Sequence, residues 1–245
     1  MMNSNYQFSE ENNPQQSVIL SDSEIKQGQT AFINKVYNWM ALALLITGVT
    51  AYFSAQSEAL LSLVFSNRLV FYGLLIGEIL LVGYLGSNIR KISVSLATSL
   101  FVLYAVLNGV TLSLIMLIYT SGSIASTFFI TAGTFGAMSA YGYFTKKDLT
   151  SIGNLCIMGL FGIIIASVVN IFLSNEILYW VVTYAGVLIF VGLTAYDTQK
   201  IKRMYRAGLE DSETGQKLAL LGSITLYLDF INLFLFLLRI FGRRK

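Results

Sequence analysis

The chain has 245 residues, of which 55% are hydrophobic and only 12% are charged, and it contains one proline and no histidine. Soluble domains carry about 25% charged residues, so this composition excludes an ordinary soluble domain and indicates a membrane protein. The formal net charge of +3 is too small to predict nucleic-acid binding, and the single cysteine excludes a disulfide within the chain. Without histidine, the usual zinc sites and nucleophile–base pairs lack their parts, so we expect neither an enzyme nor a cofactor.

The first 30 residues are polar and rich in Asn, Gln, Ser and Glu, which predicts a disordered tail. No basic start followed by an apolar core occurs there, so we expect no cleavable signal peptide and assign insertion to the first span. The sequence therefore predicts a tail over residues 1–30, a membrane domain over 31–242 and a short basic tail at 243–245.

Seven apolar segments make up the predicted membrane domain. Apolar runs of about 20 residues are long enough to cross a bilayer as helices. We predict spans at about residues 36–53, 69–85, 92–119, 124–144, 152–173, 177–196 and 218–240. The fold class is therefore all-α, a polytopic membrane protein with one compact bundle. In the fourth span Ala132, Gly136 and Ala140 recur every four residues, a spacing that predicts close helix packing.

The positions of lysine and arginine predict the orientation. Alternate connections hold most of them: Lys26, Lys35, Arg90, Lys91, Lys146, Lys147, Lys200, Lys202, Arg203, Arg206 and Lys217. The opposite loops hold only Arg68, and positive loops stay cytoplasmic, so we expect a cytoplasmic N-terminus. Seven crossings then place residues 243–245 outside, against the charge rule, whereas a re-entrant last segment keeps them inside. We favour a full last span, because its 23 residues can cross about 30 Å.

Three acidic residues lie in or beside the spans. Glu78 is inside the second span, Asp197 ends the sixth, and Asp229 is in the middle of the seventh. A carboxylate near the centre of a span costs on the order of 3 kcal/mol, so it normally faces protein or water and marks an ion or proton path. Structural roles stay open beside this interpretation: Asp229 paired with Arg239 or capped by Asn232, and Asp197 simply solvated.

A close approach of Asp197 and Asp229 would have a chemical consequence. The two carboxyls can share a proton, and the pair then titrates closer to physiological pH. When deprotonated, the pair offers hard oxygen ligands of the kind that Ca²⁺ accepts, supplemented by water and by Asn or backbone carbonyls. When protonated, it closes through a hydrogen bond and loses affinity for a cation. This is the hypothesis of a proton-sensitive gate for a divalent cation; the spacing alone does not pair the two acids.

Three segments carry a resemblance to a known family. They are FGAMSAYGYFTKKDL at 135–149, LTAYDTQKIKRMY at 193–205 and LYLDFINLFLFLLRIFG at 226–242. Together and in this order they resemble the characteristic segments of the Bax inhibitor family, and the similarity extends over residues from about 31 to 242. The resemblance implies a seven-helix bundle with the last helix central and wrapped by the other six.

The resemblance also implies a function, that of a pH-sensitive calcium-leak channel. The paired aspartates of the family match Asp197 and Asp229, which would also hold the Ca²⁺. An arginine that can latch onto the pair best matches Arg90, with Lys91 as a rival, and the acid of the second helix matches Glu78, an additional pore acid. The expected ions are therefore Ca²⁺ and H⁺.

Two other kinds of function stay open. Bacterial members of the family are linked to control of a membrane-bound AAA protease, so an interaction protein in protease or stress regulation is one alternative. A proton-coupled carrier is the other. Substitution of either aspartate by Asn should alter a channel, whereas a pure scaffold should tolerate it. We expect a multi-pass protein surrounded by lipid in a bacterial inner membrane, with no nucleic acid as partner.

Overall fold

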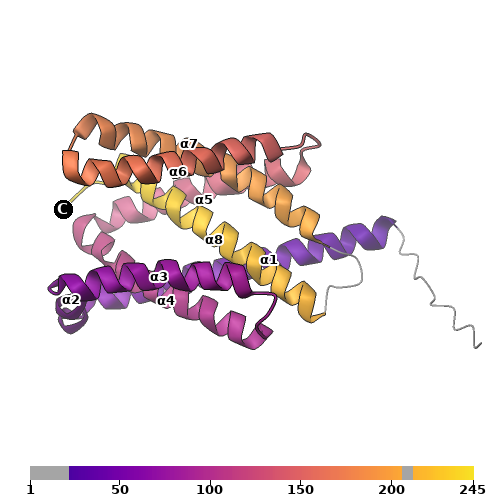
Figure 1. Cartoon of the computed structure of the whole chain (residues 1–245), viewed down its shortest axis with the longest axis horizontal. Coiled ribbons are helices and arrows are strands. Elements are labelled where there is room, and N and C mark those ends of the chain that lie inside the picture. The colour runs from indigo at the N-terminus through magenta and orange to yellow at the C-terminus, as the bar shows by residue number, and fades with distance from the viewer. Residues whose placement is uncertain (1–21, 206–211) are drawn as a thin grey trace, which may run out of the picture.

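The computed structural model describes residues 22–205 and 212–245, and their regular structure is helical apart from one β-bridge between Tyr119 and Arg244 (Figure 1). The described residues form eight helices: α1 (Asp22–Gln56), α2 (Glu58–Phe65), α3 (Arg68–Asn88), α4 (Val94–Ile118), α5 (Ser121–Phe144), α6 (Thr150–Leu173), α7 (Glu176–Met204) and α8 (Glu213–Phe241). Each predicted span falls within one of the seven long helices to within a few residues, so the prediction of an all-α fold is confirmed.

The first helix begins earlier than predicted. Residues 22–30, expected within the disordered tail, are the first turns of α1. The side chain of Gln29 donates a hydrogen bond to the backbone oxygen of Lys202 (3.2 Å), and Phe32 and Ile33 are buried directly after it. Contact with α7 thus stabilises a segment whose polar composition alone predicted disorder. Residues 1–21 of the predicted tail lie outside the described residues, as does Arg206 of the connector.

A short helix occupies the first predicted loop. Ser57 and Asn67 cap the N-termini of α2 and α3, each accepting a hydrogen bond from a backbone N–H two or three residues on. Helix α2 has 8 residues, EALLSLVF, which are too few to cross a bilayer. Helix α2 therefore turns the chain at one end of the bundle and adds no further crossing.

Length and composition make six of the described helices candidate membrane spans: α1, α3, α4, α6, α7 and α8. The remaining long helix, α5, has 24 residues, enough to cross about 30 Å at about 1.5 Å per residue. Its sequence is rich in Gly, Ala, Ser and Thr, which makes it less apolar than the others. The predicted count of seven spans therefore depends on α5, which packs against α7 and α8 on one face and is exposed on the other.

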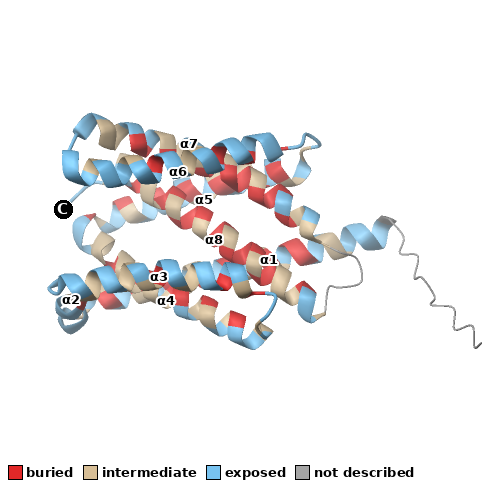
Figure 2. Cartoon of the chain, viewed as in Figure 1, coloured by how far each residue is buried: buried red, intermediate tan, exposed pale blue. Residues whose placement is uncertain are grey.

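Helix α8 is the centre of the bundle. It packs against α1, α4, α5 and α7, and most of the residues in its apolar stretch are buried (Figure 2). Helices α3 and α6 pack chiefly on α4 and α7 instead, and few of their residues are buried, which in α6 are Gly153, Cys156 and Ile163. The predicted central position of the last helix holds, but its cover consists mainly of four helices, with α3 and α6 on the outside facing lipid.

The end of α8 bears on whether the last segment crosses the bundle completely or turns back. The helix is unbroken from Glu213 to Phe241, and the residues after it bind the α4–α5 turn. The backbone N–H of Thr120 donates to the carbonyl of Arg243 (3.0 Å), and that of Lys245 donates to Ile118 (2.8 Å). Because that turn and the start of α8 lie at opposite ends of the bundle (Figure 1), α8 traverses the whole bundle and a re-entrant last segment does not fit.

The small residues of α5 do not pack as predicted. Gly136 and Ala140 are exposed, and a Cβ on Gly136 would meet nothing within 4 Å. The close approach occurs on the opposite face at Gly142, where a Cβ would overlap the backbone of Ala195 in α7. The remaining buried positions of that face are Ser123, Thr127, Thr131, Phe135 and Ser139. A spacing of four residues runs along both faces of α5, so the spacing did not identify the buried one.

Candidate ion-gating site

Asp197 of α7 and Asp229 of α8 face each other inside the bundle. Their exposed fractions are 7% and 5%, and their carboxyl groups are close enough to interact with each other. In the part of the chain that the structure describes, the Oδ2 atom of Asp229 is buried and has no hydrogen-bond partner. Two buried carboxylates cannot both stay ionised at this separation without large repulsion, so the arrangement calls for a shared proton or a cation.

The position of Asp197 follows from the length of α7. The predicted sixth span ended at residue 196, but α7 continues as a regular helix to Met204, with its N-terminus capped by Asn175. The added turns carry Asp197 inward and bury the neighbouring Thr198, whose hydroxyl lies 3.3 Å from Ser139 of α5 and 3.4 Å from the Tyr37 hydroxyl of α1. A solvated Asp197, the structural alternative, is therefore excluded.

Lys200 is a cation whose charge acts on the pair. It lies on the exposed side of α7, three residues after Asp197. Its Nζ atom is 5.8 Å from the centre of the Tyr196 ring. Residues three apart are neighbours on a helix surface, so the sequence AYDTQK already contained this signal, which the sequence prediction missed.

Neither structural alternative for Asp229 is found. The side chain of Asn232 donates to the carbonyl of Leu228 (2.8 Å), and Arg239 lies over the rings of Tyr179 and Phe236 at 5.5 and 5.1 Å. Both residues thus have other partners. Asp229 stays in the core as an acid whose charge is not balanced by its own helix.

Glu78 forms a separate polar cluster. It is buried on the inner side of α3, where its carboxylate accepts hydrogen bonds from Thr111 and, at 3.4 Å, from Asn108 of α4. The carboxamide oxygen of Asn108 has no partner among the described residues. The structure therefore brings Glu78 to α4 and not to the aspartate pair, and its role as a pore acid stays a prediction.

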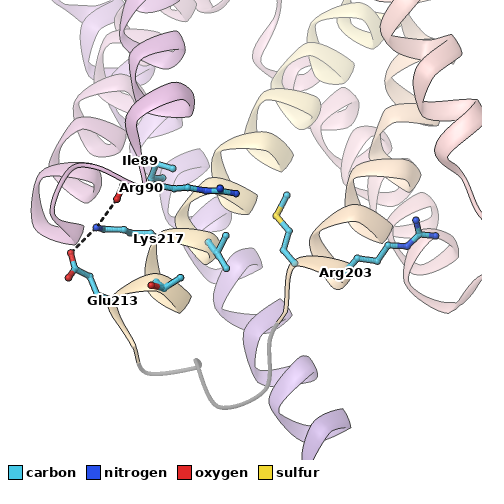
Figure 3. Close-up of a pocket in the computed structure, with 8 residues that line it drawn as sticks. Ile89, Arg90, Arg203, Glu213 and Lys217 are labelled. Atoms are coloured by element: carbon cyan, nitrogen blue, oxygen red, sulfur yellow. Dashed lines mark hydrogen bonds and ion pairs between the residues drawn. The ribbon is translucent and has the colours of Figure 1, made fainter.

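Arg90 is not at the aspartate pair in this structure. It is exposed, follows α3 at the end of the bundle and lines a cavity of about 480 Å³ with Arg203, Glu213 and Lys217 (Figure 3). Lys217 donates to the Arg90 carbonyl (3.4 Å) and pairs with Glu213 (2.8 Å). The two ion pairs found among the described residues leave Arg90 apart from both aspartates. The predicted latch would need a movement of this end of α3, and its rival Lys91, which is also exposed, has no ion pair there either.

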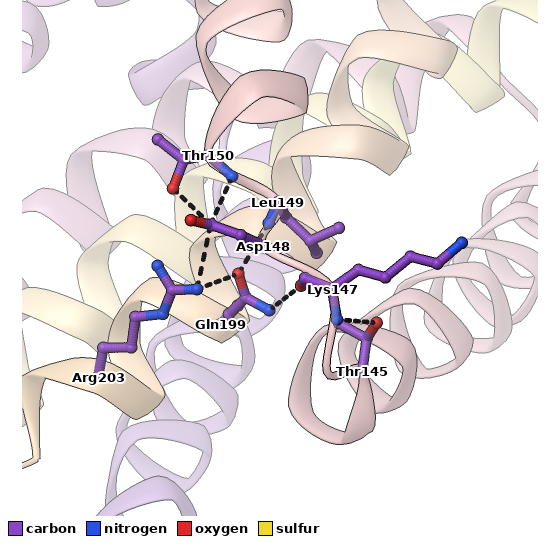
Figure 4. A network of polar contacts seen from close by, with 7 residues as sticks. All are labelled: Thr145, Lys147, Asp148, Leu149, Thr150, Gln199 and Arg203. Carbon is purple, nitrogen blue, oxygen red and sulfur yellow. Dashed lines mark hydrogen bonds and ion pairs between the residues drawn. The ribbon is translucent and has the colours of Figure 1, made fainter.

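A polar network next to the pair ties three helices together (Figure 4). Gln199 of α7 accepts a hydrogen bond from the buried N–H of Leu149 (3.0 Å) and donates to the carbonyl of Lys147 (2.9 Å). Arg203 donates to Gln199 (2.9 Å) and pairs with Asp148 (3.1 Å). Sequence reasoning missed this network, because its partners lie about 50 residues apart. It fixes the α5–α6 turn to α7 just beyond Asp197.

We expect Gln199→Leu to lower the free energy of unfolding by about 2 kcal/mol, because it leaves the buried N–H of Leu149 without an acceptor. The melting temperature in detergent should fall by roughly 4–8 °C. Asp148→Asn is the matched control, since Asp148 is exposed and its loss leaves no buried group unpaired. Equal melting temperatures for Gln199→Leu and the native chain would contradict a structural role for this network.

The pair by itself offers few ligands to a metal ion. No group of three or more Asp, Glu or Cys side chains that could hold a metal occurs within residues 22–205 and 212–245. Tight Ca²⁺ sites take six to eight oxygen ligands. Two carboxyls therefore suit a hydrated cation in transit better than a firmly held one, and Ca²⁺ binding by Asp197 and Asp229 stays a proposal.

These features define a class of protein: an integral, multi-pass helical membrane protein with two facing aspartates in its core. Residues 29–245 match the family described as "Inhibitor of apoptosis-promoting Bax1", and the chain belongs to this Bax inhibitor family. It is 51% identical over 228 residues to the inner membrane protein YbhL of Escherichia coli, covering 92% of this chain and 97% of that protein. An uncharacterized protein of Borreliella burgdorferi is 48% identical over 214 residues, covering 87% and 92% of the two chains. An uncharacterized membrane protein of Streptococcus pyogenes is 35% identical over 228 residues, covering 92% and 97%.

Proposed function

We propose that this protein is a pH-sensitive leak pathway for cations, with Ca²⁺ as the permeant ion and the Asp197–Asp229 pair as the gate. The observation that carries the proposal is the burial of both carboxyls against each other, with one oxygen of Asp229 unpartnered. A binding scaffold has no need of intramembrane carboxylates, which are costly to bury.

The composition narrows the choice of pH sensor. The chain contains no histidine, the residue that ordinarily titrates between pH 5 and 8. Outside the spans, hydrogen bonds from Thr150 and then from Arg203 hold the pKa of Asp148 at about 2, below its usual value. Asp148 therefore stays ionised throughout that range, and its network does not respond to the proton. We therefore assign the pH response to the buried acids.

The gate would operate through the state of one shared proton. With the proton present, a hydrogen bond between the carboxyls holds α7 against α8, and the single negative charge that remains is engaged in that hydrogen bond. With the proton lost, the two carboxylates repel each other and offer oxygen ligands to an entering cation. Lys200, on the exposed side of α7 three residues after Asp197, adds a positive charge near the gate.

The orientation follows from the two ends of the bundle. Ten described lysines and arginines belong to the end that carries the α3–α4, α5–α6 and α7–α8 connections, against five at the other end, which are Arg68, Arg239, Arg243, Arg244 and Lys245. Because positive loops stay cytoplasmic, we place the first end and the N-terminus in the cytoplasm. The name of the E. coli relative supports a bacterial inner membrane.

The proposal predicts Ca²⁺ influx into liposomes that contain the purified chain, with a rate that changes between pH 5 and pH 8. One proton changes the ratio of the two states about tenfold per pH unit, so the rate should change by at least about tenfold across these three pH units. An internal Ca²⁺-sensitive dye measures the influx, and empty liposomes from the same lipid are the control.

The alternatives predict other outcomes of the same experiment. No influx above empty liposomes at any pH would refute the leak pathway and favour an interaction protein, such as a regulator of a membrane-bound protease. A saturable exchange of solute that depends on a proton gradient would favour a carrier instead.

A further inference from the structure

An apolar groove runs between α1 and α5. Helix α1 packs on α4 and α8, and α5 packs on α7 and α8, so α8 forms the floor between them through Phe230, Ile231 and Phe234. The groove encloses about 380 Å³, and a second hollow of about 510 Å³ continues it along α1. Both are lined by Gly48 and Phe128. The two hollows therefore form one elongated groove along the side of the bundle.

The rim of this groove is exposed to the bilayer. Phe129 of α5 is 74% exposed and Tyr52 of α1 is 58% exposed, and both line the groove. These residues lie within helices long enough to cross the membrane, where no water competes for an apolar surface. The molecule that reaches this site is therefore a lipid acyl chain.

Cations stand at one end of the groove. The ammonium of Lys245 donates to the carbonyl of Met116 (2.7 Å), and Met116 lines the groove. The backbone N–H of Arg243 donates to the hydroxyl of Ser123 (2.9 Å), two residues after the lining residue Ser121. Arg243 and Lys245 are exposed, and in an extended segment they share one side. Arg244 is on the other side and lines a different cavity, beside the α6–α7 turn.

We propose that this groove binds one anionic glycerophospholipid, with an acyl chain along α8 and the phosphate group next to Arg243 and Lys245. The charge of the site fits such a lipid, because the acidic residues described at this end of the bundle, Glu58 and Glu176, do not line the groove. The site would also explain how Arg243 and Lys245 are accommodated at the end of the bundle that the charge rule leaves poor in lysine and arginine. It is independent of the proposed ion pathway.

Native mass spectrometry of the full chain in mild detergent tests the proposal. The chain is mixed with equal amounts of phosphatidylglycerol and phosphatidylethanolamine that have the same acyl chains. We expect one retained lipid, with a preference for phosphatidylglycerol on the order of tenfold from two cations near its phosphate. Equal retention of the two lipids would overturn the anionic site.

Two pairs of variants separate the acyl-chain contact from the charge contact. Gly48→Leu places a larger side chain in the groove at a position where a Cβ meets nothing within 4 Å, and it should remove the retained lipid of either kind. Gly162→Leu is the control, because Gly162 is equally open but lies on α6. Arg243→Gln with Lys245→Gln should abolish the preference but not the binding, whereas Arg244→Gln should keep both.

Two results would refute the proposal. One is full lipid retention by Gly48→Leu, and the other is an unchanged preference after loss of Arg243 and Lys245. Gel filtration confirms that each variant is folded. If Gly48→Leu aggregates, the comparison of the charge variants still decides the outcome, since those substitutions leave every backbone hydrogen bond of the tail in place.

Discussion

Replacement of Asp229 by Asn should remove most of the pH dependence of Ca²⁺ influx between pH 5 and pH 8. Asn keeps the size of the side chain and its capacity for hydrogen bonds, but it cannot ionise, so the repulsion between the two carboxylates is lost at every pH. The native ratio of states changes about tenfold per pH unit, whereas we expect the rate of the variant to change less than about twofold over the range. The double variant Asp197→Asn/Asp229→Asn should show no dependence at all.

The control for this experiment is Asp148→Asn, which removes a carboxylate from the α5–α6 turn. Because the pKa of Asp148 is lowered to about 2, this residue does not titrate between pH 5 and pH 8, and its replacement should leave the native pH profile unchanged. A native profile in the double variant, with normal reconstitution, would show that another group senses the proton. Glu78→Gln would then be the next substitution to measure.

Substitution of Gly142 by Val should cause the largest loss of stability. A Cβ at this position would overlap the backbone carbonyl of Ala195, which cannot move aside as a flexible side chain would. Overpacking typically costs 1–3 kcal/mol, and contact with backbone places this site at about 3 kcal/mol or more, a loss of roughly 6–12 °C in melting temperature. Since Ala195 is two residues before Asp197, the pH dependence of influx should also be disturbed in whatever protein remains folded.

Gly136→Val is the matched control in the same helix. Its Cβ meets nothing within 4 Å, so the added side chain points into lipid and should change the melting temperature by less than about 2 °C. Thermal unfolding followed by fluorescence-detected gel filtration compares both variants with the native chain. Equal stability of the two variants would mean that α5 does not approach α7 closely at Gly142.

The long helices were predictable because a bilayer demands continuous apolar segments of nearly fixed length. Helices outside the membrane were not predictable, because their formation depends on tertiary contacts. Residues 22–30 are helical through their packing on α7, and α2 forms where a loop was predicted. The sequence also did not predict which face of a helix is buried within the bundle. Gly136 and Gly142 both lie on α5, and only the position of Ala195 shows which of them is in contact.

The candidate site was predictable in part. An acid inside an apolar segment indicated Asp229 directly, but the partnership with Asp197 depends on how α7 and α8 pack, and the 31 residues between them gave no distance. The family resemblance supplied the pair. It also supplied Arg90 as a latch, and the structure places that residue in another cavity, because Arg90 follows the end of α3 whereas the pair lies deeper in the bundle.

Helix α8 makes different kinds of contact with α1 and with α7, and this difference determines which helices would move together. Towards α1, the hydroxyls of Tyr227 and Thr47 lie 2.7 Å apart, and Ser223 donates to the carbonyl of Val36 (2.9 Å). Towards α7, the contact includes two acids that repel each other once their proton is lost. The Gln199 network joins α7 to the α5–α6 turn. Ionisation would therefore move α5, α6 and α7 together as a rigid block, hinged against a stationary half formed by α1, α3, α4 and α8.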